Sequence, residues 1–242
     1  MLKEKLKYLE HTPNTTVDVV IVTEKDNQLY YLLSKRGDNK DDPFPNKLGL
    51  CGSFFDIKKD KNITCSAIRG LKQKVNLKNT PKLKTLETFS DKNRDPRWHT
   101  LTVVMLGFIN YDDLVLNEEL SSDVELITLD EVNAREIAFD HKEIINFADR
   151  VIKKEAQISA RIVNLLPSEF TLPALQDLYE MVLNSKLDKS SFRKQVRESG
   201  LLVETGEQLK QARGKPALVY TVNPEFNIDE DWFFPRSVAK NK

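Results

Sequence analysis

The chain has 242 residues, 40% of them hydrophobic and 31% charged, which is typical of a folded globular protein and argues against disorder. Its 37 basic and 37 acidic side chains cancel, but nucleic-acid binding stays open because it depends on where charges cluster. Two cysteines exclude a disulfide scaffold, and no apolar run approaches the ~20 residues of a membrane span, so we expect a cytoplasmic protein without membrane contact.

The first half of the chain alternates strand-like and helical segments. Residues 16–23 and 29–34 are rich in β-branched and apolar side chains, and the polar turn between them predicts a hairpin. Residues 64–75 carry apolar side chains at helical spacing, whereas 100–109 and 124–128 resemble strands. This order predicts a domain in which strands and helices are mixed.

A longer helical pattern then runs over 140–165 and ends before Pro167, a residue that cannot continue a helix. The composition changes after this proline, so we place a domain boundary there. We predict a first domain over 1–150, a linking helix over 151–166 and a second domain over 167–242.

The second domain begins with a helical segment and continues with the signals of a second helix. Asp188 is a suitable N-cap for a helix over 189–199, and Gly200 is a suitable terminator. Two strand-like runs, 201–205 and 217–222, follow and are joined by a basic turn. Helix, turn, helix and hairpin is the order expected of a winged helix-turn-helix.

Basic side chains are concentrated in this second domain. Residues 186–220 contain eight Lys or Arg and four Asp or Glu, a local balance of +4 in a neutral chain. Such a helix fits the major groove of DNA, although a solvated basic helix or a protein-binding winged helix would show the same charges. The predicted DNA-binding residues are Lys186, Lys189, Ser190, Ser191, Arg193, Lys194, Arg197, Arg213 and Lys215.

One segment of the first domain, 48–77, resembles a damaged Nudix box, the loop–helix–loop pattern G-x5-E-x7-R-E-x2-E-E-x-G. In an intact box the carboxylates share one helical face and hold divalent ions on a pyrophosphate. Arg69 matches the arginine of the pattern, but the three carboxylate positions fall on Gly70, Gln73 and Lys74. The resemblance therefore implies no hydrolase activity, no catalytic residues, no required cofactor and no metal site.

Other blocks widen this resemblance. RDPR at 94–97, FDH at 139–141, and FTLPALQDLYE with LDKSSFRK in the second domain resemble, in order, the Nudix-related transcriptional regulators of NAD metabolism (NrtR-type). The resemblance extends over 15–220. It implies an α+β fold, with an N-terminal Nudix-like α/β/α sandwich built on a mixed sheet and a C-terminal winged helix-turn-helix.

The same resemblance implies a function. The chain would be a homodimeric repressor of NAD-related genes that binds a palindromic double-stranded DNA operator. Its inactive Nudix domain would sense ADP-ribose or a related nucleotide, and this effector would change the spacing of the two DNA-reading helices. Two other hypotheses stay open: an active Nudix-type nucleoside-diphosphate hydrolase with an accessory domain, and a winged-helix protein-interaction adaptor.

A nucleotide effector needs cations for its phosphates and a flat apolar surface for its base. The predicted ligand-binding residues are Arg36, Phe44, Arg69, Asp95, Arg97 and His99. For several of them a structural role is the alternative. Arg69 could orient the old catalytic helix through an ion pair, Asp95 and Arg97 could cap a tight turn, and Phe44 could belong to the core.

Overall fold

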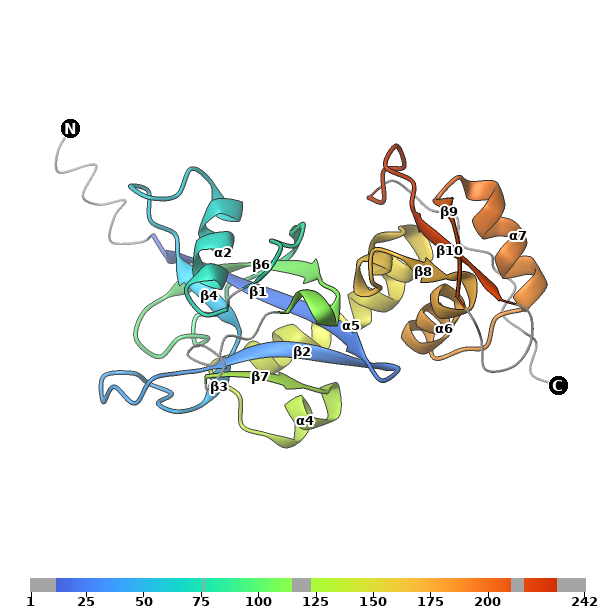
Figure 1. The fold of residues 1–242 in the computed structure, drawn as a ribbon. Helices are drawn as coiled ribbons and strands as arrows, with labels where there is room; N and C mark the ends of the chain where they lie inside the picture. The colour runs from blue at the N-terminus through green and yellow to red at the C-terminus, as the bar shows by residue number, and fades with distance from the viewer. Residues whose placement is uncertain (1–11, 76, 115–122, 210–215, 230–242) are drawn as a thin grey trace. The chain divides into compact units, whose positions relative to one another are not determined.

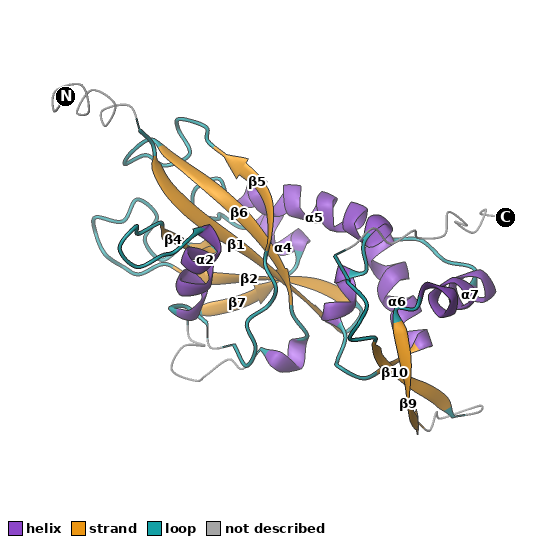
Figure 2. Cartoon of the chain, turned by 90° about the horizontal axis from the view of Figure 1, so that it is seen from above, coloured by secondary structure: helices purple, strands orange, loops and turns teal. Residues whose placement is uncertain are grey.

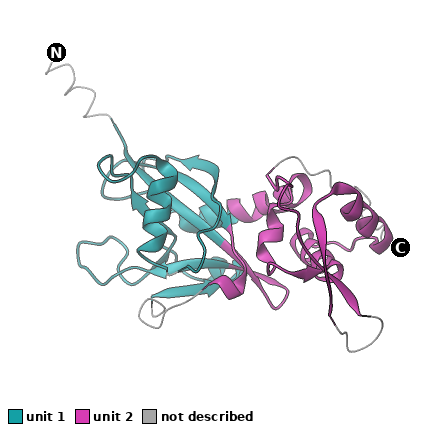
Figure 3. Ribbon diagram, turned by 45° about the horizontal axis from the view of Figure 1, so that its top comes forward, with its two compact units in different colours: residues 1–21, 31–107, 115–146 teal, residues 22–30, 108–114, 147–242 magenta. Residues whose placement is uncertain are grey.

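The computed structural model describes residues 12–75, 77–114, 123–209 and 216–229. The chain divides into two compact units, and the first comprises 1–21, 31–107 and 115–146 (Figure 3). The division crosses several strands and one helix of the N-terminal part, so it does not test the predicted domain boundaries, which stay predictions.

Seven strands of the described residues form one sheet, with the order β3-β2-β1-β6-β5, while β4 pairs with β1 and β7 pairs with β2. These strands are β1 (Asn14–Lys25), β2 (Gln28–Lys35), β3 (Leu48–Gly49), β4 (Cys51–Phe54), β5 (Lys84–Phe89), β6 (Thr100–Phe108) and β7 (Val124–Ile127). β1 lies in the middle of this sheet, and its valine and isoleucine side chains are completely buried, as expected of a strand that is covered on both faces. The predicted hairpin is present, and its turn residues Asp26 and Asn27 both have positive φ, as a two-residue turn requires.

The sheet is mixed. Asn14 donates its backbone N–H to the His99 carbonyl at one end of β1, and Ile109 donates to the Val22 carbonyl at the other, so β1 and β6 run in parallel. β4 pairs with β1, and β5 with β6, in the antiparallel direction. The predicted α+β fold class with a mixed sheet is therefore confirmed.

Helices lie on both sides of these strands. α2 (Ile63–Lys72) begins at Asn62, whose side chain accepts a hydrogen bond from the Cys65 amide, and it packs against β4. α2 and the first half of α5 (His141–Ile158) lie on opposite sides of β1 and β6 (Figure 1). Two short helices also lie among the described residues of this part: α4 (Leu129–Ala134) and the 3-10 turn η1 (Tyr111–Asp113). This layering is the predicted α/β/α sandwich.

The linking helix predicted over 151–166 is not continuous. α5 ends at Ile158, and a 3-10 helix, η2 (Arg161–Leu165), follows. The Ser159 hydroxyl donates to the Glu155 carbonyl at 3.3 Å and accepts from the Arg161 amide at 3.5 Å. The Glu155 carbonyl also accepts a hydrogen bond from the Ser159 amide at 2.8 Å, so the serine hydroxyl adds a bond to the last turn of α5, and such side-chain bonds compete with continuation of the helix. Apolar periodicity over 140–165 could not show this break.

The C-terminal part has the element order predicted from its caps. It contains β8 (Phe170–Thr171), α6 (Leu172–Leu183), α7 (Lys189–Ser199), β9 (Leu202–Leu209) and β10 (Ala217–Val222), with the three strands ordered β8-β10-β9 (Figure 1). β9 and β10 form the hairpin of this domain (Figure 2). Asp188 caps α7, and Gly200 ends it with a φ of 77°. Tyr179 of α6 contacts Phe192 of α7, with ring centroids 5.7 Å apart. Among the described residues, no helix is long and apolar enough to cross a membrane.

Candidate functional site

A pocket of about 210 Å³ opens in the first unit, where β1, the end of β2, β4 and the start of α5 meet the loop 94–97. Its lining combines charged side chains with two phenyl rings, the exposed Phe54 and the half-buried Phe139. The residues that give the pocket its chemistry are Asp18, Arg36, Asp42, Lys74, Arg94, Asp95, Arg97, Phe139 and His141.

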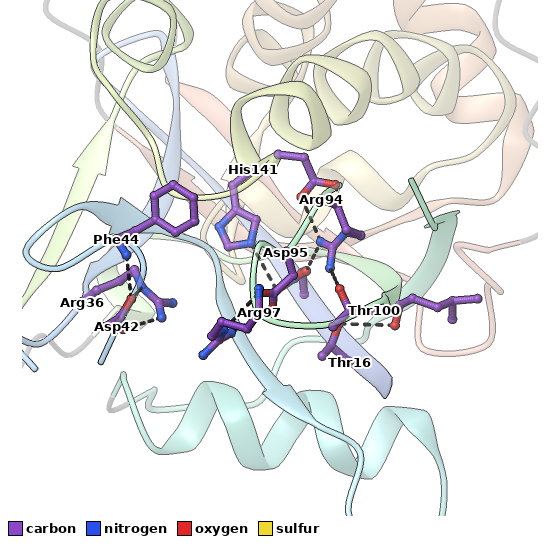
Figure 4. A network of polar contacts seen from close by, with 12 residues as sticks. Thr16, Arg36, Asp42, Phe44, Arg94, Asp95, Arg97, Thr100 and His141 are labelled. Carbon is purple, nitrogen blue, oxygen red and sulfur yellow. Dashed lines mark hydrogen bonds and ion pairs between the residues drawn. The ribbon is translucent and has the colours of Figure 1, made fainter. Parts of the chain in front are cut away.

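Arg94 holds the base of this pocket together (Figure 4). Its guanidinium donates to both carboxylate oxygens of Asp140, at 2.9 and 2.8 Å, and to the Thr100 hydroxyl at 3.1 Å. It also donates to Asp18 at 3.2 Å, and its side chain is only 4% exposed. A buried charge of this kind is tolerated because every side of it is paired.

His141 completes the base. Its Nδ1 accepts a hydrogen bond from the Leu50 amide at 2.9 Å, so the ring proton lies on Nε2, which is 3.5 Å from an Asp18 oxygen. Burial raises the pKa of the Asp18 carboxyl, but His141, Arg94 and Thr102 outweigh burial and lower this pKa to about 2. Asp18 is therefore ionised.

Two further Arg–Asp pairs border the pocket. Arg36 donates to both oxygens of Asp42, at 3.0 and 2.5 Å, and Arg97 donates to both oxygens of Asp95, at 3.0 and 2.9 Å. Burial raises the pKa of both carboxyls, but the hydrogen bonds from the arginines outweigh it and hold each pKa below its ordinary value. Both guanidiniums lie over the Phe139 ring, at 4.7 and 5.6 Å from its centroid.

The helix α2 itself contributes little to the pocket, because Arg69 is turned to other partners and Gly70 packs against β4. Arg69 donates to both oxygens of Asp60, at 2.8 and 2.6 Å, and to the Phe54 carbonyl at 2.7 Å. A β-carbon added at Gly70 would lie 3.0 Å from the carbonyl carbon of Gly52. The backbone of β4 therefore occupies the space where a side chain on Gly70 would begin.

The predicted ligand-binding residues divide into two groups. Arg36, Asp95 and Arg97 line the pocket. Phe44 packs on Phe139 with ring centroids 4.6 Å apart and lines a neighbouring hollow instead. Arg69 and His99 are not among the lining residues: Arg69 forms the ion pair that was its alternative role, and His99 is exposed. Their part in ligand binding stays a prediction with no support from the geometry.

Of the pocket residues named above, the predicted set omits six: Asp18, Asp42, Lys74, Arg94, Phe139 and His141. One signal could have found Asp18, since a carboxylate in the middle of an apolar strand requires a partner. Arg94, Phe139 and His141 lie in the blocks RDPR and FDH, which are adjacent only in the folded chain.

A second candidate site is the outward face of α7. Phe192 and Val196 are buried, which leaves the basic side chains on the other face. A shallow hollow on this face is lined by Lys189, Ser190, Arg193, Lys194 and Arg197, together with two acidic residues. Hydrogen bonds from Ser190 and Ser191 lower the pKa of the capping carboxylate of Asp188 to about 2. The hollow thus brings together five of the predicted DNA-binding residues, and a sixth, Ser191, lies in the same helix.

The other three predicted DNA-binding residues differ in position. Lys186 precedes α7 and pairs with Glu180 at 2.5 Å, which partly neutralises its charge. Arg213 and Lys215 lie outside the described residues.

These two sites define a class of protein: a Nudix-like domain followed by a winged-helix domain. The family model of the NrtR DNA-binding winged helix domain matches residues 162–222. The chain is also 32% identical over 227 residues to the ADPR responsive transcriptional repressor NtrR of Acinetobacter baylyi, covering 93% of this chain and 87% of the relative. The chain therefore belongs to the NrtR family.

Solved structures agree with this assignment. Shewanella oneidensis NrtR, crystallised with a 27mer DNA, is 29% identical to this chain with a TM-score of 0.78, covering 90% of this chain and 99% of that one. The Nudix domain of the same protein in complex with ADP ribose is 28% identical with a TM-score of 0.51, covering 61% of this chain and 97% of that one.

Proposed function

We propose that the chain is a transcriptional repressor of NAD-related genes, which binds a palindromic operator as a homodimer and releases it when its Nudix-like domain binds ADP-ribose or a related nucleotide. The observation that carries this proposal is the basic outward face of α7 in a winged-helix domain of this family. The relative from Acinetobacter baylyi is named an ADPR responsive repressor, and the Shewanella oneidensis structures contain DNA in one case and ADP ribose in another. Operator DNA lies in the cytoplasm, where we place the protein.

The pocket supports a nucleotide effector. Arginine guanidiniums at its border suit phosphate oxygens, and the Phe139 ring between them is an apolar face on which a base or ribose can pack. We therefore place the effector against Arg36, Arg97 and Phe139.

We further propose that the pocket does not hydrolyse this effector. Hydrolysis in this fold depends on helical carboxylates that hold divalent ions, and Gly70 of α2 and the residues Gln73 and Lys74 that follow it stand at those positions. Incubation of the protein with ADP-ribose and Mg²⁺ should release no AMP above a blank. Turnover at an ordinary enzymatic rate would instead support the hydrolase hypothesis.

The DNA-binding half is tested by selecting duplexes from a random library with the full-length protein and measuring their affinity by fluorescence anisotropy. We expect a palindromic consensus, and an affinity that falls steeply with salt because bound lysines and arginines release counterions from DNA. ADP-ribose should lower the anisotropy. A weak anisotropy change that does not depend on salt would favour the protein-interaction adaptor. A separate light-scattering measurement that gives the mass of one chain would exclude the homodimer.

A further inference from the structure

Every arginine that lines the pocket is already neutralised by an aspartate. Arg36 pairs with Asp42, Arg97 with Asp95, and Arg94 with Asp18 and Asp140. A diphosphate ligand that meets these groups therefore meets ion pairs rather than free positive charge. The pocket lining contains one more cation, Lys74.

Lys74 has no carboxylate partner among the described residues, so its charge is the uncompensated one in this pocket. It lies in the turn just after α2, where its amide donates to the Leu71 carbonyl at 3.0 Å and the next residue, Val75, is buried. The turn is thus held by the backbone and by apolar packing, while the ammonium is free to meet a ligand. The positive charge of Lys74 lowers the pKa of the Cys51 thiol of β4, and so it opposes the rise in this pKa that burial causes.

A divalent ion, which this fold would use in a hydrolase, does not fit these residues. Among the described residues, no group of three His, Cys, Asp or Glu side chains is placed to hold a metal ion. Lys74 adds an ammonium at one of the three positions where an intact Nudix box has carboxylates, and an ammonium repels a dication. The close approach of Gly70 to Gly52 also makes a side chain at another of these positions a tight fit, because its β-carbon would lie 3.0 Å from the backbone of β4.

We propose that Lys74 takes over the electrostatic role of the divalent ion, so that the diphosphate of the effector binds to its ammonium and binding needs no metal. This inference rests on the proposed function and names the group that holds the phosphates. Because a charge-assisted hydrogen bond contributes about 1.5–3 kcal/mol, Lys74→Ala should weaken ADP-ribose binding roughly ten- to hundredfold.

The experiment is calorimetric titration of the full-length protein with ADP-ribose, first in EDTA and then in excess Mg²⁺. The variants are Lys74→Ala and Lys74→Arg, with Lys72→Ala as the matched control, because Lys72 is an exposed lysine of α2 that does not line the pocket. We expect the wild type to bind in EDTA and Mg²⁺ not to strengthen this binding. Lys74→Ala should lose affinity, while Lys74→Arg and Lys72→Ala keep it.

The outcomes separate the two proposals. Binding that requires Mg²⁺, or equal affinity of Lys74→Ala and wild type in EDTA, overturns the role of Lys74 and leaves the effector proposal standing. If folded wild-type protein binds no ADP-ribose under either condition, the effector proposal fails and the role of Lys74 fails with it. Equal melting temperatures of the variants exclude unfolding as the cause of lost affinity.

Discussion

Asp18 is the residue on which most contacts at the base of the pocket converge, since both Arg94 and His141 face its carboxylate. Its position in the central strand β1 makes it the link between the sheet core and the ligand site. A carboxylate this deeply buried must remain ionised, or the arginine opposite it would lose a partner. The stability of the fold should therefore depend on the charge of Asp18.

The first prediction concerns pH. The pKa of Asp18 in the folded chain is about 2, below its ordinary 3.8, so its stabilising contribution is present above about pH 4 and is lost as the pH falls towards 2. A shift of this size corresponds to about 2 kcal/mol. Urea unfolding between about pH 2 and 6 should show a steeper loss of stability in the wild type than in Asp18→Asn. The variant Asp41→Asn, at an exposed position, should lose stability with pH as the wild type does. If Asp18→Asn also follows the wild-type profile, the ionised Asp18 carboxylate does not stabilise the fold.

Gly70 gives the second prediction. Alanine is favoured over glycine in a helix by about 1 kcal/mol, but overpacking costs about 1–3 kcal/mol, and the new β-carbon would lie 3.0 Å from backbone of β4. We expect Gly70→Ala to lower the free energy of unfolding by about 1 kcal/mol in a chemical denaturation. Lys72→Ala, on the exposed side of the same helix, should change it little. A stabilised Gly70→Ala would mean that α2 can move away from β4.

At the scale of elements, α7 is defined by local signals and anchored by two side chains. The Asp188 cap and the left-handed Gly200 set its ends, while Phe192 packs on Tyr179 of α6. Its basic face is thus presented by a helix whose position is set by the core of the domain. This arrangement suits contact with DNA phosphates and base edges.

The third prediction uses the salt dependence of DNA binding. Replacing Arg193 and Lys194 by alanine should weaken operator binding and should lower the slope of log affinity against log salt by about 2, because two phosphate contacts are lost. Lys154→Ala, an exposed lysine of α5, is the control and should leave the slope unchanged. Fluorescence anisotropy titrations of operator DNA at several salt concentrations give this slope for each variant. An unchanged slope for the double variant would place the DNA elsewhere on the protein.

At the scale of the whole molecule, the proposed function requires the pocket and α7 to influence each other through the equilibrium between two states of the protein. An effector can release the operator only if it binds one state more tightly than the other. Thermodynamic linkage then makes the effect reciprocal, so that operator DNA must weaken effector binding by the same factor.

The fourth prediction tests this reciprocity. Coupling of about 1–3 kcal/mol corresponds to a five- to 150-fold change in affinity, measured for ADP-ribose with and without operator and for operator with and without ADP-ribose. Arg97→Ala should weaken effector binding and should leave the affinity of the unliganded protein for operator unchanged. Two unequal coupling factors would show that the ligand acts by another route, such as direct competition for DNA.

Much of the fold was predictable, because its signals are short in range. Caps, left-handed terminators and β-branched runs lie within a few residues of the elements that they define, as Asp188 and Gly200 do for α7. The prediction of one helix over 140–165 was wrong because apolar periodicity continues past Ile158, where α5 ends and a 3-10 helix follows.

The sequence by itself determined the first hairpin, the two helices and the hairpin of the second domain, and the basic character of α7. It also showed that Gly70, Gln73 and Lys74 stand where an intact Nudix box has carboxylates. Only the tertiary structure decided which charges meet. Arg94 reaches Asp140 across 46 residues and Asp18 across 76, and no local pattern relates positions so far apart. These pairs form because the sheet order brings β1, the loop 94–97 and the start of α5 together, where Arg94 and Asp18 are buried. The same packing leaves Lys74 as the cation of the pocket lining that has no carboxylate partner among the described residues.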